Sequence, residues 1–184
     1  MIRDWKDHLP DESLYFRMAD PRDTDIDDFD CGSSPEALEV SSYFKGRQWF
    51  DYSKEKSKPP TWQLGTRDEI IGYLSISHGN RPHPDNNSTT KARYLTIYVV
   101  GIHKQFQGRI NPTALTPERY AATIYRSCED FFAKIRPDCV GLRLEVRTNN
   151  VRAIQSYQKY GFMNDPGGPI IKNGKSTVVM RKIF

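Results

Sequence analysis

The sequence predicts an α/β protein with a mixed sheet, and three observations support this. Short apolar or alternating runs are typical of strands, and two longer stretches repeat apolar residues at helical spacing. The second half of the chain also reads as strand, long helix, strand, helix, strand. With 184 residues, the chain is long enough to build a core without metals or disulfides and short for two full domains. We therefore expect one domain over residues 1–184.

The first half predicts strands around one helix. Residues 14–19 form a β-prone run, and the acidic stretch 23–30 is typical of a loop or the start of a helix. Ser34 is a capping residue followed by Pro35, so a helix is expected from there through Trp49, ending before a lysine-rich linker at 54–60. Two further strands, 61–66 and 70–77, predict a hairpin, and 79–90 predicts a long connection.

The second half opens with the most strongly β-patterned strand, 94–102. Thr116 and Pro117 predict the start of an amphipathic helix that Pro137 ends. Residues 141–147 alternate apolar and charged side chains, as in a strand with one buried face. A helix from 151 to about 160, closed by Gly161, and strands near 162–163 and over 177–183 complete the predicted order.

Composition narrows the choice of compartment and partner. Lys and Arg number 27 against 23 Asp and Glu, a net charge of +4 that permits an anionic partner such as a phosphate-bearing cofactor or RNA. Arg47 with Lys54, Lys56 and Lys58 is either a basic patch for RNA or a solvated charged run. The charged N-terminus and the lack of a long apolar stretch predict no signal peptide and no membrane association.

The three cysteines lie far apart and no histidines cluster near them. This spacing favours neither a disulfide framework nor a metal site, and it predicts a reduced, cytoplasmic compartment.

The passage from Val100 to Arg109 carries the first chemical signal. A strand that ends in polar, glycine-containing backbone before a long helix offers N–H groups and a helix dipole to a phosphate. The alternative is an ordinary connection between a strand and a helix.

The segment Asn150-x-x-Ala153-x-x-x-Tyr157-x-x-x-Gly161-Phe162 resembles the C-terminal signature of the GNAT superfamily of acyl-CoA-dependent N-acyltransferases. In the same register, residues 103–109 resemble that family's pyrophosphate loop, Arg/Gln-x-x-Gly-x-Gly/Ala, with Gln107 in first place. The resemblance implies a mostly antiparallel sheet with flanking helices and a central parallel strand pair that splays apart. It also implies direct acetyl transfer from acetyl-CoA to a primary amine within a ternary complex.

Roles for individual residues follow from this resemblance. The backbone of Val100 and Ile102 would pair with the pantetheine amides, while Gln107, Gly108 and Arg109, with N–H groups near Thr116, would bind the phosphates. Asn150 would bond the pantetheine arm or cap its helix. Tyr157 would protonate the coenzyme A thiolate as general acid, or else simply pack on the sheet. No metal is implied.

The chain departs from the family pattern in its loop. Ile110 and Pro112 stand where the two later glycines belong, and residues 111–115 delay the helix. Either the loop is remodelled and still binds the cofactor, or the domain is a degenerate acyl-CoA-binding or regulatory module without catalysis.

The acceptor is less well defined. Residues 29–32, Phe-Asp-Cys-Gly, resemble a turn of bacterial GNAT toxins that acetylate aminoacyl-tRNA, so tRNA, a small amine or a protein are the acceptors considered, and a homodimer is a compatible assembly. Carboxylates and histidines near strand ends are either a general base or ordinary surface residues: Glu145, Glu69, His103 and His78.

Overall fold

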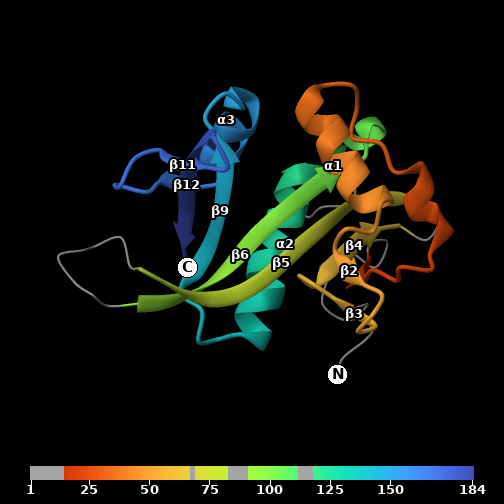
Figure 1. The fold of residues 1–184 in the computed structure, drawn as a ribbon, viewed down its shortest axis with the longest axis horizontal. Coiled ribbons are helices and arrows are strands. Elements are labelled where there is room, and N and C mark those ends of the chain that lie inside the picture. Colours follow the sequence, from red (N-terminus) through yellow and green to blue (C-terminus); the bar gives the residue numbers. More distant parts are fainter. Residues whose placement is uncertain (1–14, 67–68, 83–90, 112–117) are drawn as a thin grey trace. The chain divides into compact units, whose positions relative to one another are not determined.

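The computed structural model describes residues 15–66, 69–82, 91–111 and 118–184 (Figure 1). They form two compact units. The first comprises the described residues up to Ile76 together with Val99–Cys128, and the second comprises Ser77–Tyr98 with Glu129–Phe184.

The main sheet is mixed and mostly antiparallel. Its strand order is β1 (Tyr15–Met18), β4 (Thr61–Gly65), β5 (Ile70–Pro82), β6 (Lys91–Ile102), β9 (Gly141–Arg147), β12 (Lys175–Ile183) and β10 (Met163–Asn164), with β11 (Ile170–Lys172) also paired to β12. The β6–β9 pair is parallel. This arrangement confirms the predicted α/β class with a central parallel pair.

The first unit has an aromatic core beneath its N-terminal segments. A 3-10 helix, η2 (Thr24–Asp28), leads to helix α1 (Pro35–Lys45). The rings of Phe29 and Tyr73 meet edge to face at 4.8 Å, and Phe44 stacks on Tyr73 at 5.3 Å. Because these rings are almost fully buried, they fix η2 and α1 against β5.

Helix α1 begins as predicted and ends earlier than predicted. Ser34 accepts a hydrogen bond from the N–H of Ala37 with Pro35 in the first turn, but the helix stops at Lys45. Arg47 adopts a positive φ of 50° and donates from Nε to the carbonyl of Pro21 at 2.7 Å. These bonds to the preceding loop break the helical path, so Trp49 enters the core from outside the helix.

The prediction that Arg47 contributes to a basic patch is wrong. Its Nη1 pairs with Asp27 at 2.7 Å, and its side chain is 17% exposed. The lysine-rich segment 54–60 is not a plain linker either, because Phe50–Asp51 (β2) and Lys56–Ser57 (β3) pair as a small hairpin.

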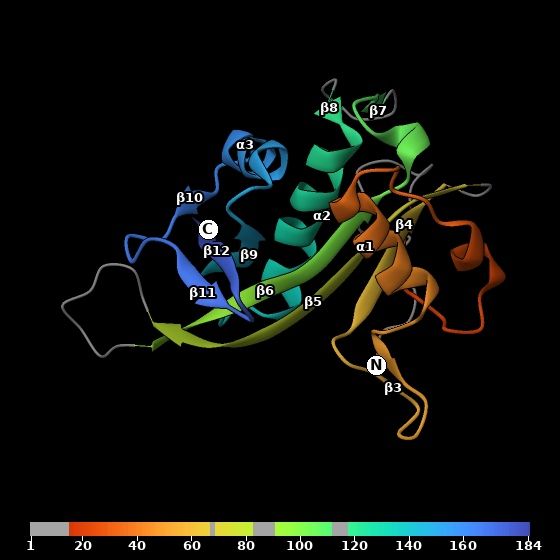
Figure 2. The same cartoon turned by 45° about the horizontal axis from the view of Figure 1, so that its top comes forward.

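Helix α2 (Tyr120–Ile135) begins later than predicted. Glu118–Arg119 (β8) pairs with Ile110–Asn111 (β7) instead of continuing the helix (Figure 2). The expected start at Thr116 and Pro117 lies outside the described residues, as does most of the predicted 79–90 connection. Strand β5 extends into that connection as far as Pro82.

The second unit is built on β9. Leu142 and Leu144 are buried on β9, and Met180 is buried on β12, which pairs antiparallel with β9 from Gly141 to Arg147. The registered parallel pairs with β6 run from Tyr94–Gly141 to Ile97–Leu144. Beyond Leu144, the described register of β9 is with β12.

All three cysteines are buried, and none forms a disulfide within the part of the chain that the structure describes. Among the helices in the described ranges, none has the length and apolar character needed to cross a membrane.

Candidate active site

The loop after β6, residues 103–109, is called here the cofactor loop. It opens with His103, whose Nδ1 accepts from the N–H of Gln105, and continues as a one-turn 3-10 helix, η3 (Lys104–Phe106). Phe106 is buried and packs edge to face on Tyr120 at 5.1 Å. This contact anchors the loop to the first residue of α2.

Gly108 and Arg109 form the exposed tip of the loop. Gly108 has a φ of +74°, a conformation that favours glycine, and an added Cβ would meet no atom within 4 Å. Among the described residues, no carboxylate pairs with the guanidinium of Arg109. The tip therefore offers open backbone beside an uncompensated positive charge, which fits a phosphate.

Gln107, unlike Gly108 and Arg109, is hydrogen-bonded within the protein. Its side-chain amide donates to the carbonyl of Cys31 at 2.7 Å and to the carbonyl of Ile102 at 2.9 Å. Its own N–H donates to the carbonyl of Lys104 at 3.3 Å. The donors of Gln107 thus hold the loop together.

The turn Phe29–Gly32 lies directly against the cofactor loop. Lys104 Nζ pairs with Asp30 Oδ2 at 2.7 Å, and the pKa of Asp30 is lowered first by this bond and then by the N–H of Gly32. The Lys104 charge is therefore compensated locally. Burial raises the pKa of Cys31 to about 11, so its thiol stays protonated at neutral pH.

Val100 and Ile102 lie at the carboxyl end of β6 and are half-buried. Between them, Gly101 packs against α1, which Figure 1 shows beside this end of β6. The carbonyl of Ile102 already accepts from Gln107. Five predicted cofactor residues, Val100, Ile102, Gln107, Gly108 and Arg109, thus share one strand end and one loop in the first unit.

Asn150 and Tyr157 share helix α3 (Val151–Lys159) in the second unit. Asn150 caps this helix, since its Oδ1 accepts from the N–H of Ala153 at 3.2 Å. Tyr157 is half-buried and meets the buried ring of Phe162 at 5.7 Å. Asn150 therefore acts as the helix cap, and the Tyr157 ring packs on Phe162.

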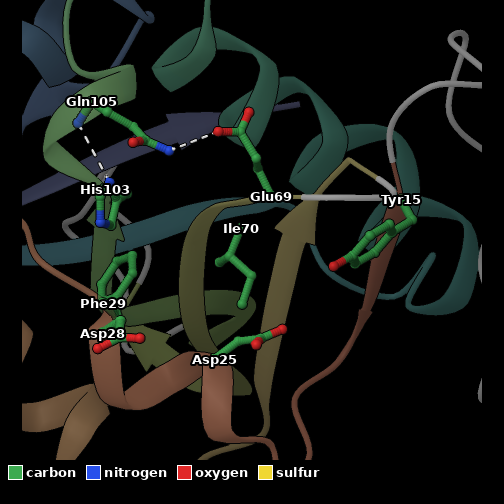
Figure 3. A pocket seen from close by; sticks show the side chains of 8 residues that line it. All are labelled: Tyr15, Asp25, Asp28, Phe29, Glu69, Ile70, His103 and Gln105. Carbon is green, nitrogen blue, oxygen red and sulfur yellow. Dashed lines mark hydrogen bonds between the residues drawn. The ribbon is translucent and has the colours of Figure 1, made fainter.

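A pocket of about 300 Å³ lies beside the cofactor loop in the first unit. Figure 3 shows Glu69 and Gln105 on one side of it and Asp25 and Asp28 on the other. Gln105 Nε2 donates to Glu69 Oε1 at 3.2 Å. The full lining is Tyr15, Asp25, Asp28, Phe29, Glu69, Ile70, His103 and Gln105. Three carboxylates make this pocket favourable to a cation.

The residues predicted as candidate general bases differ in their surroundings. Glu69 and His103 line the pocket. Glu145 instead accepts from Arg143 at 2.8 Å and from Lys172 at 2.5 Å. Burial opposes the charge of Glu145, but the bonds from Lys172 and Arg143 outweigh it and lower the pKa of that carboxyl. Glu145 is thus a poor proton acceptor.

His78 is also a poor candidate for the general base. Its ring contacts the guanidinium of Arg136, and burial together with that positive charge lowers its pKa. Within the described ranges, no group of three or more His, Cys, Asp or Glu side chains is arranged to hold a metal ion.

Sequence reasoning missed the contacts between the 29–32 turn and the cofactor loop. The motif Phe-Asp-Cys-Gly and the loop motif were each visible, but their contacts join residues as far apart as Cys31 and Gln107. The one available signal was the pairing of an Asp in one motif with a Lys in the other.

A strand that ends in a glycine-tipped loop before a long helix, followed by a capped helix carrying a tyrosine, is an arrangement found in acyl-CoA-dependent transferases. Residues 23–162 match the model of the acetyltransferase (GNAT) family. The chain belongs to this family, whose members use acetyl-CoA as the acyl donor.

Solved structures with the same fold include several toxins. A mutant form of the toxin AtaT, bound to the C-terminus of the antitoxin AtaR and acetyl-CoA, is 16% identical with a TM-score of 0.57, covering 91% of this chain and 92% of its own. A structure described as a bacterial toxin is 16% identical with a TM-score of 0.61, covering 92% and 90%. PH1933 from Pyrococcus horikoshii OT3 is 20% identical with a TM-score of 0.55, covering 93% and 98%. No curated protein matches the chain by sequence.

Proposed function

We propose that the protein is an acetyl-CoA-dependent N-acetyltransferase, acting as one domain over residues 1–184. The observation that carries this proposal is the tip of the cofactor loop, where Gly108 at φ +74° precedes an exposed Arg109 with no paired carboxylate among the described residues. Family membership supplies the class of reaction, and this tip supplies a phosphate site within it.

Acetyl-CoA brings an activated thioester to this reaction. In the proposed step, the lone pair of a neutral primary amine forms the C–N bond at the thioester carbonyl, and the C–S bond breaks. Tyr157 gives its phenolic proton to the departing thiolate, and water accepts the proton that the amine nitrogen loses. Solvent then returns a proton to the Tyr157 phenolate, which restores the acid. A phenol suits this role because it is protonated at neutral pH. No covalent enzyme intermediate is required, consistent with a Cys31 thiol that stays protonated.

The remaining residues bind the donor in this proposal. Arg109 and the backbone at Gly108 hold the phosphates, while the backbone of Val100 and Ile102 and the side chain of Asn150 hold the pantetheine arm. Gln107 contributes by shaping the loop, since its amide donors are used within the protein. In this proposal, these residues hold the donor without the two later glycines of the family pattern, where this sequence has Ile110 and Pro112.

The acceptor is proposed to be a primary amine. AtaT, to which this chain is similar, has been solved with acetyl-methionyl-tRNAfMet, at 15% identity and a TM-score of 0.55. Together with the Phe29–Gly32 turn, this favours aminoacyl-tRNA as one acceptor to test. The three carboxylates of the pocket favour a small cationic amine as another.

A degenerate, non-catalytic module is the second candidate, and Ile110 is the observation that favours it. Ile110 is 58% exposed and paired with Arg119, so a side chain and a strand pair stand where the family has a glycine. Thermal unfolding with and without acetyl-CoA tests binding, because a ligand at 100 times its Kd adds about 2.7 kcal/mol. Radiolabelled acetyl transfer to aminoacyl-tRNA, polyamines and peptides then separates the candidates. Stabilisation without transfer to any acceptor would favour an acyl-CoA-binding module. No stabilisation at millimolar donor would contradict the transferase and favour a regulatory module that does not bind the donor.

A further inference from the structure

We infer that Gln107 is a positioning residue that fastens the cofactor loop to the Phe29–Gly32 turn, so that phosphate binding at the loop tip is transmitted to the turn and to the pocket beside it. The inference rests on the proposed function, because it takes Gly108 and Arg109 as the phosphate site.

The first support is the bonding of the Gln107 amide. A primary amide has two N–H donors, and here one reaches the carbonyl of Cys31 at 2.7 Å and the other the carbonyl of Ile102 at 2.9 Å. Since both neighbours are acceptors only, chemistry fixes which end of the amide faces them. No donor remains on this side chain for a phosphate. Gln107 therefore acts through the loop's shape.

A second connection runs through Lys104. Its N–H donates to the carbonyl of Asp30 at 2.7 Å, and its Nζ pairs with Asp30 Oδ2 at 2.7 Å. The other carboxylate oxygen of Asp30 accepts from the N–H of Gly32 at 2.7 Å. The turn is thus bonded to the loop through both its backbone and its one carboxylate.

The turn has little freedom to move by itself. The N–H of Cys31 donates to Ser41 Oγ at 2.9 Å, and that hydroxyl donates to the carbonyl of Ala37 in α1 at 2.8 Å. On its other side, a Cβ placed on Gly101 would come within 2.9 Å of Cys31 Sγ. The turn is therefore packed directly on the strand that leads into the cofactor loop.

These contacts lie between the loop tip and the pocket. Asp28 and Phe29, which line the pocket, immediately precede the bonded residues of the turn, and His103 and Gln105 line it from the loop (Figure 3). A ligand that orders the loop tip consequently also orders one wall of the pocket. By linkage, a ligand in the pocket would strengthen binding at the tip by the same factor.

The test is hydrogen–deuterium exchange of the full chain with and without saturating coenzyme A. In the wild type, we expect slower exchange in peptides covering 103–109 and also in peptides covering 29–33. Gln107→Met keeps the side-chain length and removes both donors, so it should retain the protection at 103–109 and lose most of it at 29–33, where the Lys104 contacts remain. Gln107→Arg is the matched control, because its guanidinium restores N–H donors and should restore the transmitted protection.

Lys104→Met provides a second variant should Gln107→Met fail to fold. It removes the ion pair with Asp30 and leaves the Gln107 bonds, so protection at 29–33 should be reduced but present. The inference is overturned if coenzyme A protects 103–109 without affecting 29–33 in the wild type, or if Gln107→Met transmits the protection unchanged. A wild type with no protection at 103–109 would instead refute the proposed phosphate site itself.

Discussion

The peptide N–H of Tyr120 donates to the carbonyl oxygen of Arg109 at 3.3 Å. This bond joins the last residue of the cofactor loop to the first residue of α2, even though eleven positions separate them in the sequence. The main chain of Arg109 is therefore fixed while its side chain remains exposed. The positive end of the helix dipole lies at the same place.

Arg109→Ala should raise the KM for acetyl-CoA, because it removes a charge-assisted contact to phosphate. The expected loss is roughly 1.5 to 3 kcal/mol, or about 10- to 150-fold. Steady-state kinetics with varied donor measure it. Arg22→Ala is the control, since it removes the same charge from a side chain that is 87% exposed and paired with Asp20. Equal KM values for the wild type and Arg109→Ala would remove Arg109 from the site.

Gly108→Ala should weaken binding of coenzyme A, because a Cβ would occupy the space where the backbone meets phosphate. The left-handed conformation also costs an alanine about 1 to 2 kcal/mol of stability. Gly168→Ala is a matched control, with φ of +70° and open space around the added Cβ. Both variants should lose similar stability on heating, but only Gly108→Ala should lose affinity by calorimetric titration. Equal affinities of Gly108→Ala and Gly168→Ala for coenzyme A would argue against Gly108 as the position where the backbone meets phosphate.

Tyr157→Phe should lower kcat by about 10² to 10⁴ with little change in KM, because it removes the proton donor and keeps the ring. The substitution preserves the edge-to-face contact with Phe162, and thermal unfolding checks that the variant is folded. Tyr160→Phe, at the C-terminal cap of the same helix, is the control. The measurement is turnover on an acceptor verified with the wild type. If a folded Tyr157→Phe variant had wild-type turnover, Tyr157 would not be the general acid, and water would be the group that protonates the coenzyme A thiolate.

Gly101→Ala should destabilise the first unit. An added Cβ would lie 2.8 Å from Val40 Cγ1, 2.9 Å from Cys31 Sγ and 3.0 Å from Phe29 Cε1. Overpacking of this kind costs about 1 to 3 kcal/mol. Gly167→Ala, which adds a Cβ with no neighbour within 4 Å, should leave stability nearly unchanged. Urea unfolding of both variants would show the difference, and equal midpoints would contradict the packing described for β6 and the turn.

Asp138→Asn should reduce the acid sensitivity of folding. Hydrogen bonds from Arg136, and then from Arg93, lower the pKa of Asp138 to about 2 from an ordinary value of 3.8. A carboxyl with a depressed folded pKa contributes stability above its ordinary pKa and loses that contribution as pH falls from there through the folded value. The difference in Tm between wild type and Asp138→Asn should therefore shrink as pH falls from about 4 to about 2.

Asp130→Asn, a change of the same charge on the exposed side of α2, is the control for this pH series. A wild-type advantage over Asp138→Asn that stays constant down to pH 2 would contradict the assignment of the shift to Asp138.

The sequence by itself determined the fold class and most of the elements. Alternation of apolar and charged residues in 141–147 predicted the strand β9 and its bounds, because side chains of a strand point alternately to its two faces. The predicted single buried face was wrong, because Arg143 is buried between Leu142 and Leu144 in the sequence. Ser34–Pro35 and Asn150 predicted two helix starts correctly, because capping depends on groups only two or three residues away. The motifs around Gln107 and Tyr157 indicated the family for the same reason, since their spacing is local.

Tertiary structure decided what depends on distant partners. Helix α1 stops at Lys45 because Arg47 bonds to Pro21 and Asp27, and α2 starts at Tyr120 because Ile110–Asn111 pairs with Glu118–Arg119. Gln107 reads in sequence as a phosphate ligand, yet its donors are taken by the carbonyls of Cys31 and Ile102. Hydrogen-bond donors go to whichever acceptors the folded chain brings within about 3 Å, and a local pattern carries no information about acceptors many residues away.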